Sequence, residues 1–391
     1  MEFAKRFDKV TGSAIRAIFA LLGQPGMISF AGGNPSPDSF PSEQIAQIAE
    51  KLLRENGSRI LQYGGTPGIT PLKETVIEMM KQRGIKTDFE RVIITSGSTQ
   101  GIGLAAKTLC NPGDVILAES PTFIGALQTF LAYEADVKGV EMDEQGMLMD
   151  DLEQKMKRLR PKFVYTIPTF QNPTGRTMSA DRRKRMLELC QKHGVLILED
   201  DPYCDLRYSG IAEPAIKSLD EDETVIYLLS FSKIISPGLR VGAAAADSRI
   251  INKYNIAKQG EDLHTANLSQ ELVDAFMRSG QVQAHIEKIR ALYSEKRDAM
   301  LEELETFPKG ITYTQPDGGL FIWAWLPAHM DAEALFKKCV EAGVAFVPGT
   351  HFYPEGGHKN TMRLNFSMAS LDQIREGMAK LKKALQENMS S

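Results

Sequence analysis

One lysine in this chain occupies a position that suits imine chemistry. Residues 225–242 open with an apolar, β-branched-rich run that predicts a buried strand, and Lys233 follows its end. Ser230 and Ser232 lie beside it, and Arg240 comes seven residues later, after a Pro-Gly turn. Low dielectric at the mouth of a buried strand penalises an ammonium, so this amine can lose its proton more easily than a solvated one. It is a candidate for imine formation with a carbonyl compound, although a solvated strand-end lysine is the commoner case.

Two other predicted strands are followed by turns that can bind a ligand. After the run 92–95 comes the Gly/Ser loop 96–103, which leads into a helix. Free backbone N–H groups and the helix dipole at such a turn can cradle a phosphate, but the loop is neither a Walker motif nor a good dinucleotide fingerprint. After the run 163–168 comes 171–175, a Q-N-P-T-G stretch. It is a tight turn whose Asn172 amide can donate a hydrogen bond to a bound oxygen.

Charged residues occupy two further positions of interest. An acidic cluster, residues 199–201, ends the apolar run 194–198 and leads into Tyr203. Such a cluster is often only the polar boundary of a core, but a carboxylate there could pair with a cationic ring nitrogen, and Tyr203 could bond a neighbouring ring oxygen. Arg363 lies within the apolar stretch 361–366. A partly buried guanidinium needs a carboxylate partner, which an internal salt bridge or a bound ligand could supply.

The elements that must position these residues alternate along residues 91–246. Short β-rich runs are predicted at 92–95, 115–118, 163–167, 195–198 and 225–229. Helical segments separate several of them, the clearest being 181–193, with Ser179 as its predicted cap and Gly194 as its stop. This alternation predicts an α/β fold with a mostly parallel sheet covered by helices on both faces. Ligands bind past the carboxyl ends of such strands, so the residues described above are expected to meet there.

The C-terminal part has a different pattern. Strands are predicted at 311–314, 320–325, 344–352 and 361–366, with a helix at 331–342 and another at the C-terminus. These elements predict a smaller α+β domain. We expect a large domain at residues 42–285 and a small domain formed by residues 1–41 together with 286–391.

Composition excludes several classes of partner. The 391 residues carry a net charge of -4 with mixed signs, which gives no reason to expect nucleic acid or an anionic membrane as partner. No apolar run approaches the roughly 20 residues needed to span a bilayer. The four cysteines lie far apart, which predicts free thiols and a cytoplasmic location. The six histidines form no H-E-x-x-H motif, so no metal site is expected.

Three motifs, taken together, resemble those of a known family. They are D-D-P-Y at 200–203, N-P-T-G at 172–175 and S-x-S-K-x-x-x-P-G-x-R-x-G at 230–242. Together they resemble the fold-type I pyridoxal 5′-phosphate enzymes, and within these the class I/II aminotransferases. The nearest branch includes aminoadipate/kynurenine aminotransferases and the effector domains of MocR-type regulators. The resemblance covers residues 28–370 and implies an aspartate aminotransferase-like fold.

The resemblance also implies roles for individual residues. Lys233 would bind pyridoxal phosphate covalently and move a proton between the substrate and the cofactor, while Asp200 would pair with the protonated pyridine nitrogen, with Asp201 as its rival. Arg363, with Asn172 and the Gly33 backbone, would bind the substrate carboxylate. The remaining implied cofactor contacts are Asn172 and Tyr203 on the ring oxygen, Phe123 stacked on the ring, Ser98, Thr99, Ser230 and Arg240 on the phosphate, and Tyr63 from the other subunit of a homodimer.

The expected activity is transfer of an amino group from an L-amino acid to a 2-oxo acid such as 2-oxoglutarate, with ping-pong kinetics. A lyase, decarboxylase or racemase would use the same cofactor and the same residues. A sensor that binds the cofactor without turnover is a third possibility, but residues 1–41 are too few for a winged helix-turn-helix. Arg16 could contact a substrate side-chain carboxylate, although a surface arginine is the commoner case.

Overall fold

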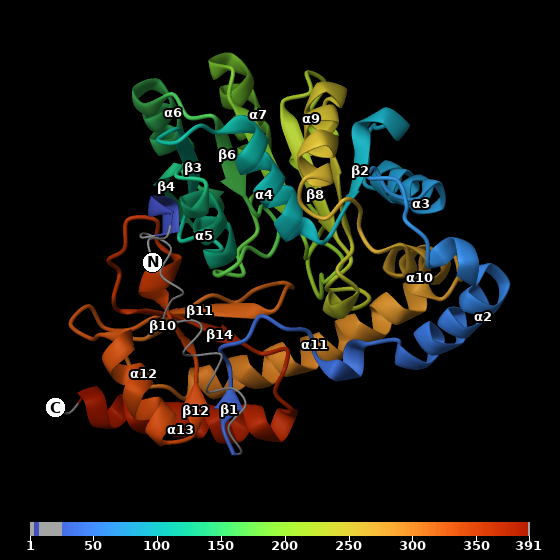
Figure 1. Ribbon diagram of the computed structural model, residues 1–391. Helices are drawn as coiled ribbons and strands as arrows, with labels where there is room; N and C mark the ends of the chain where they lie inside the picture. The colour runs from blue at the N-terminus through green and yellow to red at the C-terminus, as the bar shows by residue number, and fades with distance from the viewer. Residues whose placement is uncertain (1–3, 8–25, 390–391) are drawn as a thin grey trace.

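The computed structural model describes residues 4–7 and 26–389 and is built around an eight-stranded sheet (Figure 1). Its strand order is β2-β9-β8-β7-β6-β3-β4-β5. The four pairings from β8 through β7, β6 and β3 to β4 are parallel, while β9 and β5 pair antiparallel with their neighbours. The strands are β2 (Val92–Thr95), β3 (Val115–Ser120), β4 (Asp136–Asp143), β5 (Gly146–Met147), β6 (Phe163–Thr166), β7 (Leu196–Asp201), β8 (Val225–Ser230) and β9 (Gly242–Ala245). The predicted mostly parallel sheet is confirmed.

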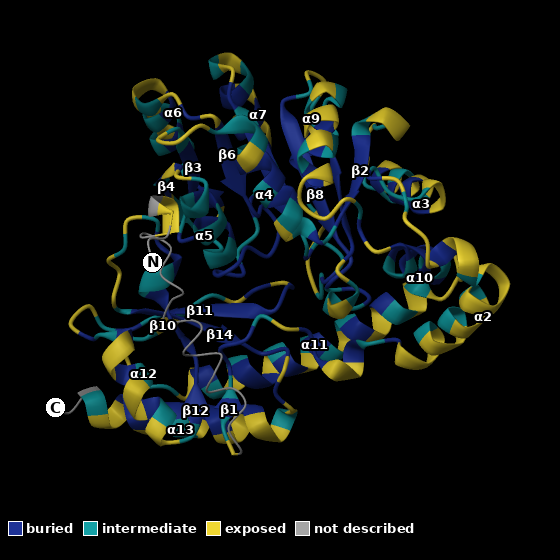
Figure 2. Ribbon diagram, viewed as in Figure 1, coloured by how far each residue is buried: buried dark blue, intermediate teal, exposed yellow. Residues whose placement is uncertain are grey.

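Helices cover both faces of this sheet, because alternate residues of its central strands point to opposite sides. In β6, Phe163 and Tyr165 pack into one core cluster with Ile102 of α4, whereas Val164 packs into another with Met186 of α7. The helices of the two layers are α4 (Ser98–Leu109), α5 (Ile124–Ala132) and α9 (Ser248–Gln259) on one side, and α6 (Met149–Leu159), α7 (Ala180–His193) and the short α8 (Ile216–Leu219) on the other. Burial is complete along β2, β6 and β8, as the dark strands of Figure 2 show.

Strand β9 was not predicted from the sequence, because its Gly-Ala-Ala-Ala composition has low β propensity. Its position explains the composition. The strand lies between β2 and β8, directly behind the start of α4. A Cβ atom added to Gly242 would lie 2.7 Å from the Leu229 carbonyl oxygen and 2.9 Å from the Ser98 amide nitrogen. Only a small residue allows α4 to begin this close to the sheet.

Helix α7 begins and ends where the sequence places it. Ser179 is the N-cap residue, although its hydroxyl makes no capping hydrogen bond, and Gly194 ends the helix with a left-handed φ of 64°. Three helices pack together at the β2 end of the molecule: α2 (Ser42–Ile60), α3 (Thr70–Gln82) and α10 (Asn267–Met277). Short 3-10 turns occur at Lys5–Phe7, Pro37–Ser39, Phe89–Arg91, Pro237–Leu239 and Gly349–Phe352.

The C-terminal part forms two small sheets that pack beside the large one (Figure 1). A four-stranded antiparallel sheet has the order β10-β11-β14-β13, and β1 pairs in parallel with β12. The first described strand therefore joins the C-terminal region. The elements are β1 (Ile28–Ser29), β10 (Thr312–Tyr313), β11 (Phe321–Trp325), β12 (Val344–Ala345), β13 (Val347–Pro348), β14 (Thr361–Asn365), α11 (Val282–Glu305), α12 (Ala332–Glu341) and α13 (Leu371–Met389).

Helix α11 connects the two parts of the molecule. In Figure 1 it extends from beside α10 to below β11 and β14, and it packs against α13. The division into residues 42–285 and residues 1–41 with 286–391 stays a prediction, and its second boundary lies in the first turn of α11. Within the described residues, no helix is both long and apolar enough to cross a membrane.

Candidate active site

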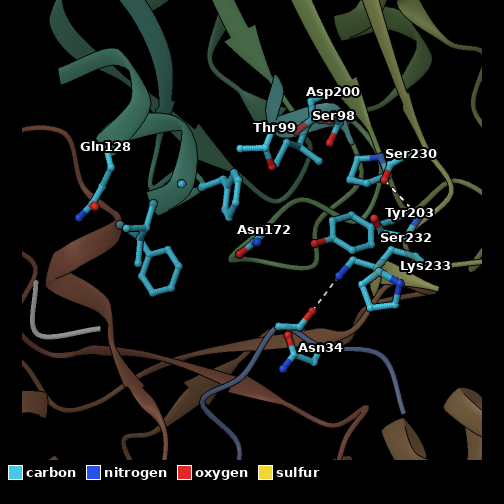
Figure 3. Close-up of a pocket in the computed structure, with 18 of the residues that line it drawn as sticks. Asn34, Ser98, Thr99, Gln128, Asn172, Asp200, Tyr203, Ser230, Ser232 and Lys233 are labelled. Atoms are coloured by element: carbon cyan, nitrogen blue, oxygen red, sulfur yellow. Dashed lines mark hydrogen bonds between the residues drawn. The ribbon is translucent and has the colours of Figure 1, made fainter. Parts of the chain in front are cut away.

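The carboxyl ends of the parallel strands open into a cavity of about 550 Å³ (Figure 3). Polar side chains that follow β2, β6, β7 and β8 meet there with residues of β14 and of the segment after β1. The sequence-predicted residues that line the cavity are Gly33, Ser98, Thr99, Phe123, Asn172, Asp200, Tyr203, Ser230, Lys233, Arg240 and Arg363. Strand ends adjacent in a parallel sheet bring the loops between Ser98 and Arg240 together, and the two small sheets bring Gly33 and Arg363 to the same cavity.

Lys233 is half-buried and directs its amine into this cavity. Its Nζ atom donates a hydrogen bond of 2.8 Å to the Gly33 carbonyl (dashed in Figure 3) and lies 5.9 Å from the centre of the Tyr203 ring. Burial lowers the pKa of the lysine to about 8, and the positive charges of Arg363 and Arg240 act in the same direction. A neutral, nucleophilic amine is therefore accessible near neutral pH.

Asp200 and Asp201 are separated by the alternation of β7. Asp200 faces the cavity, where its Oδ2 atom accepts a hydrogen bond of 3.0 Å from the Tyr165 hydroxyl. Asp201 faces the opposite side and accepts a bond of 2.7 Å from the Tyr227 hydroxyl. The Asp200 Oδ1 atom is buried without a hydrogen-bond partner among the described residues. Burial raises the pKa of Asp200 to about 7, so a cation brought against this oxygen would stabilise the carboxylate.

Arg363 is a buried cation with no carboxylate partner in the described part of the chain. Its guanidinium donates to Asn172 Oδ1 at 2.9 Å and to the Ala31 carbonyl at 2.7 Å, and its Nε atom is buried without a partner. The guanidinium carbon lies 4.4 Å from the centre of the Phe321 ring and 4.9 Å from that of Phe352. Burial lowers its pKa to about 10. The internal salt bridge that the sequence left open is not formed, so the charge is available to an anionic ligand.

A second set of anion-binding groups lies at the start of α4. Gly97 precedes the helix with a φ of +83°, and a Cβ atom there would lie 2.5 Å from the Arg240 guanidinium. Ser98 and Thr99 begin the helix and line the cavity, so their free N–H groups are available to a ligand. Arg240 donates to the Ser96 carbonyl at 3.1 Å. A helix N-terminus, two hydroxyls and a guanidinium form a donor set that suits a phosphate.

These groups fit pyridoxal phosphate. The phosphate-binding donors, the amine of Lys233 and the unpaired carboxylate oxygen of Asp200 face the same cavity. A phosphate, an aldehyde and a protonated ring nitrogen are the three groups that such residues bind. Arg363 adds a further cation, beyond those that the cofactor needs, that can bind a substrate carboxylate. In residues 4–7 and 26–389, no group of three or more His, Cys, Asp or Glu side chains is placed to hold a metal ion.

One predicted residue lies outside this arrangement. Tyr63 does not line the cavity of this single chain: 79% of it is exposed, and its ring meets His264 edge to face at 6.0 Å. Arg16 lies outside the described residues. The sequence reasoning missed Tyr165, whose hydroxyl bonds Asp200. The alternation of β6 and β7 could have identified it, because Tyr165 pairs with Leu198 and therefore shares the face of Asp200.

Comparison with known proteins gives a consistent result. The model of the family "Aminotransferase class I and II" matches residues 25–381. An aromatic-amino-acid aminotransferase of Thermococcus litoralis is 43% identical, over 99% of this chain and 94% of that protein. A 2-aminoadipate transaminase of Thermus thermophilus is 41% identical, over 98% and 96%. The crystal structure of Pyrococcus horikoshii kynurenine aminotransferase superposes with a TM-score of 0.96 at 42% identity, over 100% of this chain and 98% of that one.

These matches confirm the predicted family, fold and cofactor, and they extend over nearly the whole chain. They also agree with the predicted branch, since aminoadipate and kynurenine aminotransferases are among them. Amino acids and 2-oxo acids are the substrates that follow from this membership. The chain therefore belongs to the class I and II aminotransferases and is a pyridoxal phosphate-dependent enzyme.

Proposed function

We propose that this aminotransferase moves the amino group of an L-amino acid to 2-oxoglutarate in two half-reactions, as a cytoplasmic homodimer. The observation that carries the proposal is the pair of cations in one cavity: Lys233 and the buried Arg363 both lack a carboxylate partner in the described structure. One can act on the α-carbon of an amino acid while the other binds its carboxylate. The free cysteines of the described chain are consistent with a reducing compartment.

In this proposal, bound pyridoxal phosphate supplies an electron sink for the negative charge that develops at the substrate α-carbon. Lys233 removes the proton from that carbon and returns one as a general acid, a role that suits its lowered pKa. Asp200 keeps a negative charge against the ring nitrogen, and Tyr203 and Asn172 hydrogen-bond the ring oxygen. Arg363, with Asn172 and the Gly33 backbone, orients the substrate by its carboxylate.

The remaining residues are proposed to hold the cofactor. Phe123 would stack on its ring, and the groups assigned to its phosphate are Ser98, Thr99, Ser230 and Arg240. Tyr63 would reach the phosphate group of the cofactor that is bound to the partner subunit. The exposure of both Tyr63 and Arg240 in the single chain supports this assignment, since a second subunit would cover them.

The two half-reactions can be tested separately. Adding an amino acid alone should convert the bound cofactor to its pyridoxamine form, and adding 2-oxoglutarate alone should then reverse the change. Absorbance spectra of the enzyme monitor both steps. Aromatic amino acids, 2-aminoadipate and kynurenine are the first donors to screen, because relatives are named for them. Release of ammonia or carbon dioxide without a pyridoxamine form would instead indicate a lyase or a decarboxylase.

The charge of Arg363 should be visible in the pH dependence of cofactor capture. The Lys233 amine must be neutral to attack an aldehyde, so the capture rate should rise with pH to a plateau above about 8, the pKa of Lys233. Arg363→Met removes a positive charge that lowers this pKa, and the midpoint should move to higher pH by roughly one unit. The measurement is the rate at which cofactor-free protein binds pyridoxal phosphate. Arg297→Met, outside the cavity, is the control, and a midpoint unchanged in Arg363→Met would contradict the coupling.

A further inference from the structure

The turn Ser96–Thr99, which we call the phosphate turn, is held from behind by a buried lysine. Lys258 of α9 has a fully buried side chain. Its Nζ atom lies 2.7 Å from Gln100 Oε1, 2.8 Å from each carboxylate oxygen of Asp262 and 3.1 Å from Thr265 Oγ1. None of these four side chains is among those that line the cavity. Any effect of the cluster on a bound ligand must therefore pass through the phosphate turn.

Ser96 joins this cluster to the cavity. Its backbone N–H donates to Gln100 Oε1 at 2.8 Å, and its hydroxyl donates to Asp262 Oδ2 at 2.6 Å. Its carbonyl accepts the bond from Arg240. All three polar groups of Ser96 are thus bonded, two of them to direct partners of Lys258 and the third to a guanidinium that lines the cavity.

Gly97 brings this turn into close contact with Arg240. Gly97, directly after Ser96, has a φ of +83° and lies so close to Arg240 that even a methyl group would collide with the guanidinium. Ser98 then begins α4. A displacement of Ser96 would therefore change the positions of both the helix N-terminus and Arg240, the two groups suited to an anion.

A lysine is an unusual choice for packing α9 against α4. A buried ammonium is costly unless every proton and the counter-charge are satisfied, and an apolar side chain of similar volume would pack without that cost. Here the ammonium has an ion pair with Asp262 and two further acceptors. What the lysine adds over an apolar residue is orientation: it fixes the amide of Gln100 and the carboxylate of Asp262, which in turn fix Ser96.

We propose that Lys258 is a positioning residue that, through Gln100 and Asp262, sets how tightly the enzyme holds the phosphate group of its cofactor. The proposal rests on the assignment of Ser98, Thr99 and Arg240 to that phosphate. A supporting residue that lets a binding group shift by about an ångström costs on the order of ten- to a hundredfold. Lys258 should therefore act on the phosphate and not on the aldehyde end of the cofactor.

The test compares two aldehydes that differ only in the phosphate. Cofactor-free Lys258→Met should bind pyridoxal phosphate about ten- to a hundredfold more weakly than the parent enzyme, with the affinity for pyridoxal essentially unchanged. Absorbance titration gives both dissociation constants. Ser96→Ala removes only the hydroxyl and leaves the Lys258–Asp262 pair intact, so it tests the same link if Lys258→Met does not fold. It should show the same selective loss, to a smaller extent.

Lys217→Met is the matched control. Lys217, in α8, is also a buried lysine with an ion pair, at 3.0 Å from Asp220 and from Glu223, but it does not line the cavity and bonds neither Ser96 nor Gln100. It should leave both affinities unchanged. Arg240→Ala serves as the reference for direct phosphate binding and should lose affinity for pyridoxal phosphate selectively.

The outcomes distinguish the positioning role of Lys258 from the assignment of Arg240, Ser98 and Thr99 to the phosphate. If Arg240→Ala loses phosphate selectivity while Lys258→Met and Ser96→Ala do not, the positioning role is wrong and the phosphate assignment stands. An equal loss of affinity for both aldehydes in Lys258→Met and Ser96→Ala also overturns the positioning role. If Arg240→Ala weakens both aldehydes equally, the phosphate assignment fails and the role of Lys258 fails with it.

Discussion

Replacing Lys233 by alanine is expected to lower kcat by about 10⁴-fold, the upper range for loss of a positioned acid–base group. The variant loses the only amine that lines the cavity of the described structure, and with it both covalent attachment and proton transfer at the substrate α-carbon. Steady-state rates with a good donor and 2-oxoglutarate measure the loss of proton transfer. Borohydride treatment measures the loss of covalent attachment, because it should fix the cofactor to the parent protein and not to the variant.

Lys73→Ala is a suitable control for that experiment. Lys73 is also buried, with 4% of its surface exposed, but its Nζ atom donates to the Phe89 carbonyl at 2.7 Å, outside the cavity. Its loss should leave kcat and borohydride labelling unchanged even if stability falls. A Lys233→Ala protein that is still labelled, or that retains parental activity, would remove the basis of the proposed chemistry.

Replacing Arg363 by alanine is expected to lower kcat/KM for the amino acid by roughly 10²- to 10⁴-fold. A guanidinium binds a carboxylate through two charge-assisted hydrogen bonds, each worth about 1.5–3 kcal/mol. Arg363→Lys keeps the charge but not the planar fork, so it should recover only part of the loss. Kinetics at low substrate concentration measure both variants.

The affinity for pyridoxal phosphate should change far less than kcat/KM, since Arg363 is assigned to the substrate. Arg297→Ala is the control. Its guanidinium also lies over an aromatic ring, 5.4 Å from the centre of Tyr208, and donates to the Pro316 carbonyl, but it does not line the cavity. Equal losses of cofactor affinity and of kcat/KM in Arg363→Ala would contradict the assignment to the substrate carboxylate.

Sequence reasoning located most of the cavity because the chemistry follows the strands. Lys233 and Asn172 follow apolar runs within a few residues, and Asp200 is the second-to-last residue of β7. A parallel sheet places such positions at one edge regardless of their separation along the chain. The choice between Asp200 and Asp201 needed the resemblance, because alternation assigns them to opposite faces without saying which face holds the cavity.

What the sequence could not predict depends on contacts between distant segments that share no local pattern. The bond between Ser96 and Asp262 joins residues 166 positions apart, and no spacing rule links a helix-end aspartate to a Gly/Ser loop. Strand β9 was missed for a related reason, since its small residues reflect the close approach of α4 and not a propensity of their own. Tyr63 stays a prediction, because its assigned contact lies in a second subunit.

The hydrogen bond from Lys233 to the Gly33 carbonyl has a consequence for the wall of the cavity. Ala31 and Gly33 accept bonds from Arg363 and Lys233, so one short stretch of backbone is anchored by both cations. A Lys233 nitrogen bound to the cofactor would keep at most one hydrogen to donate, whereas a released amine would have at least two. Leaving a hydrogen-bond acceptor without its donor costs about 1–3 kcal/mol when the acceptor is shielded from water. The stretch would therefore be held more firmly when Lys233 is free than when it is bound covalently, and its rigidity would alternate with the catalytic cycle.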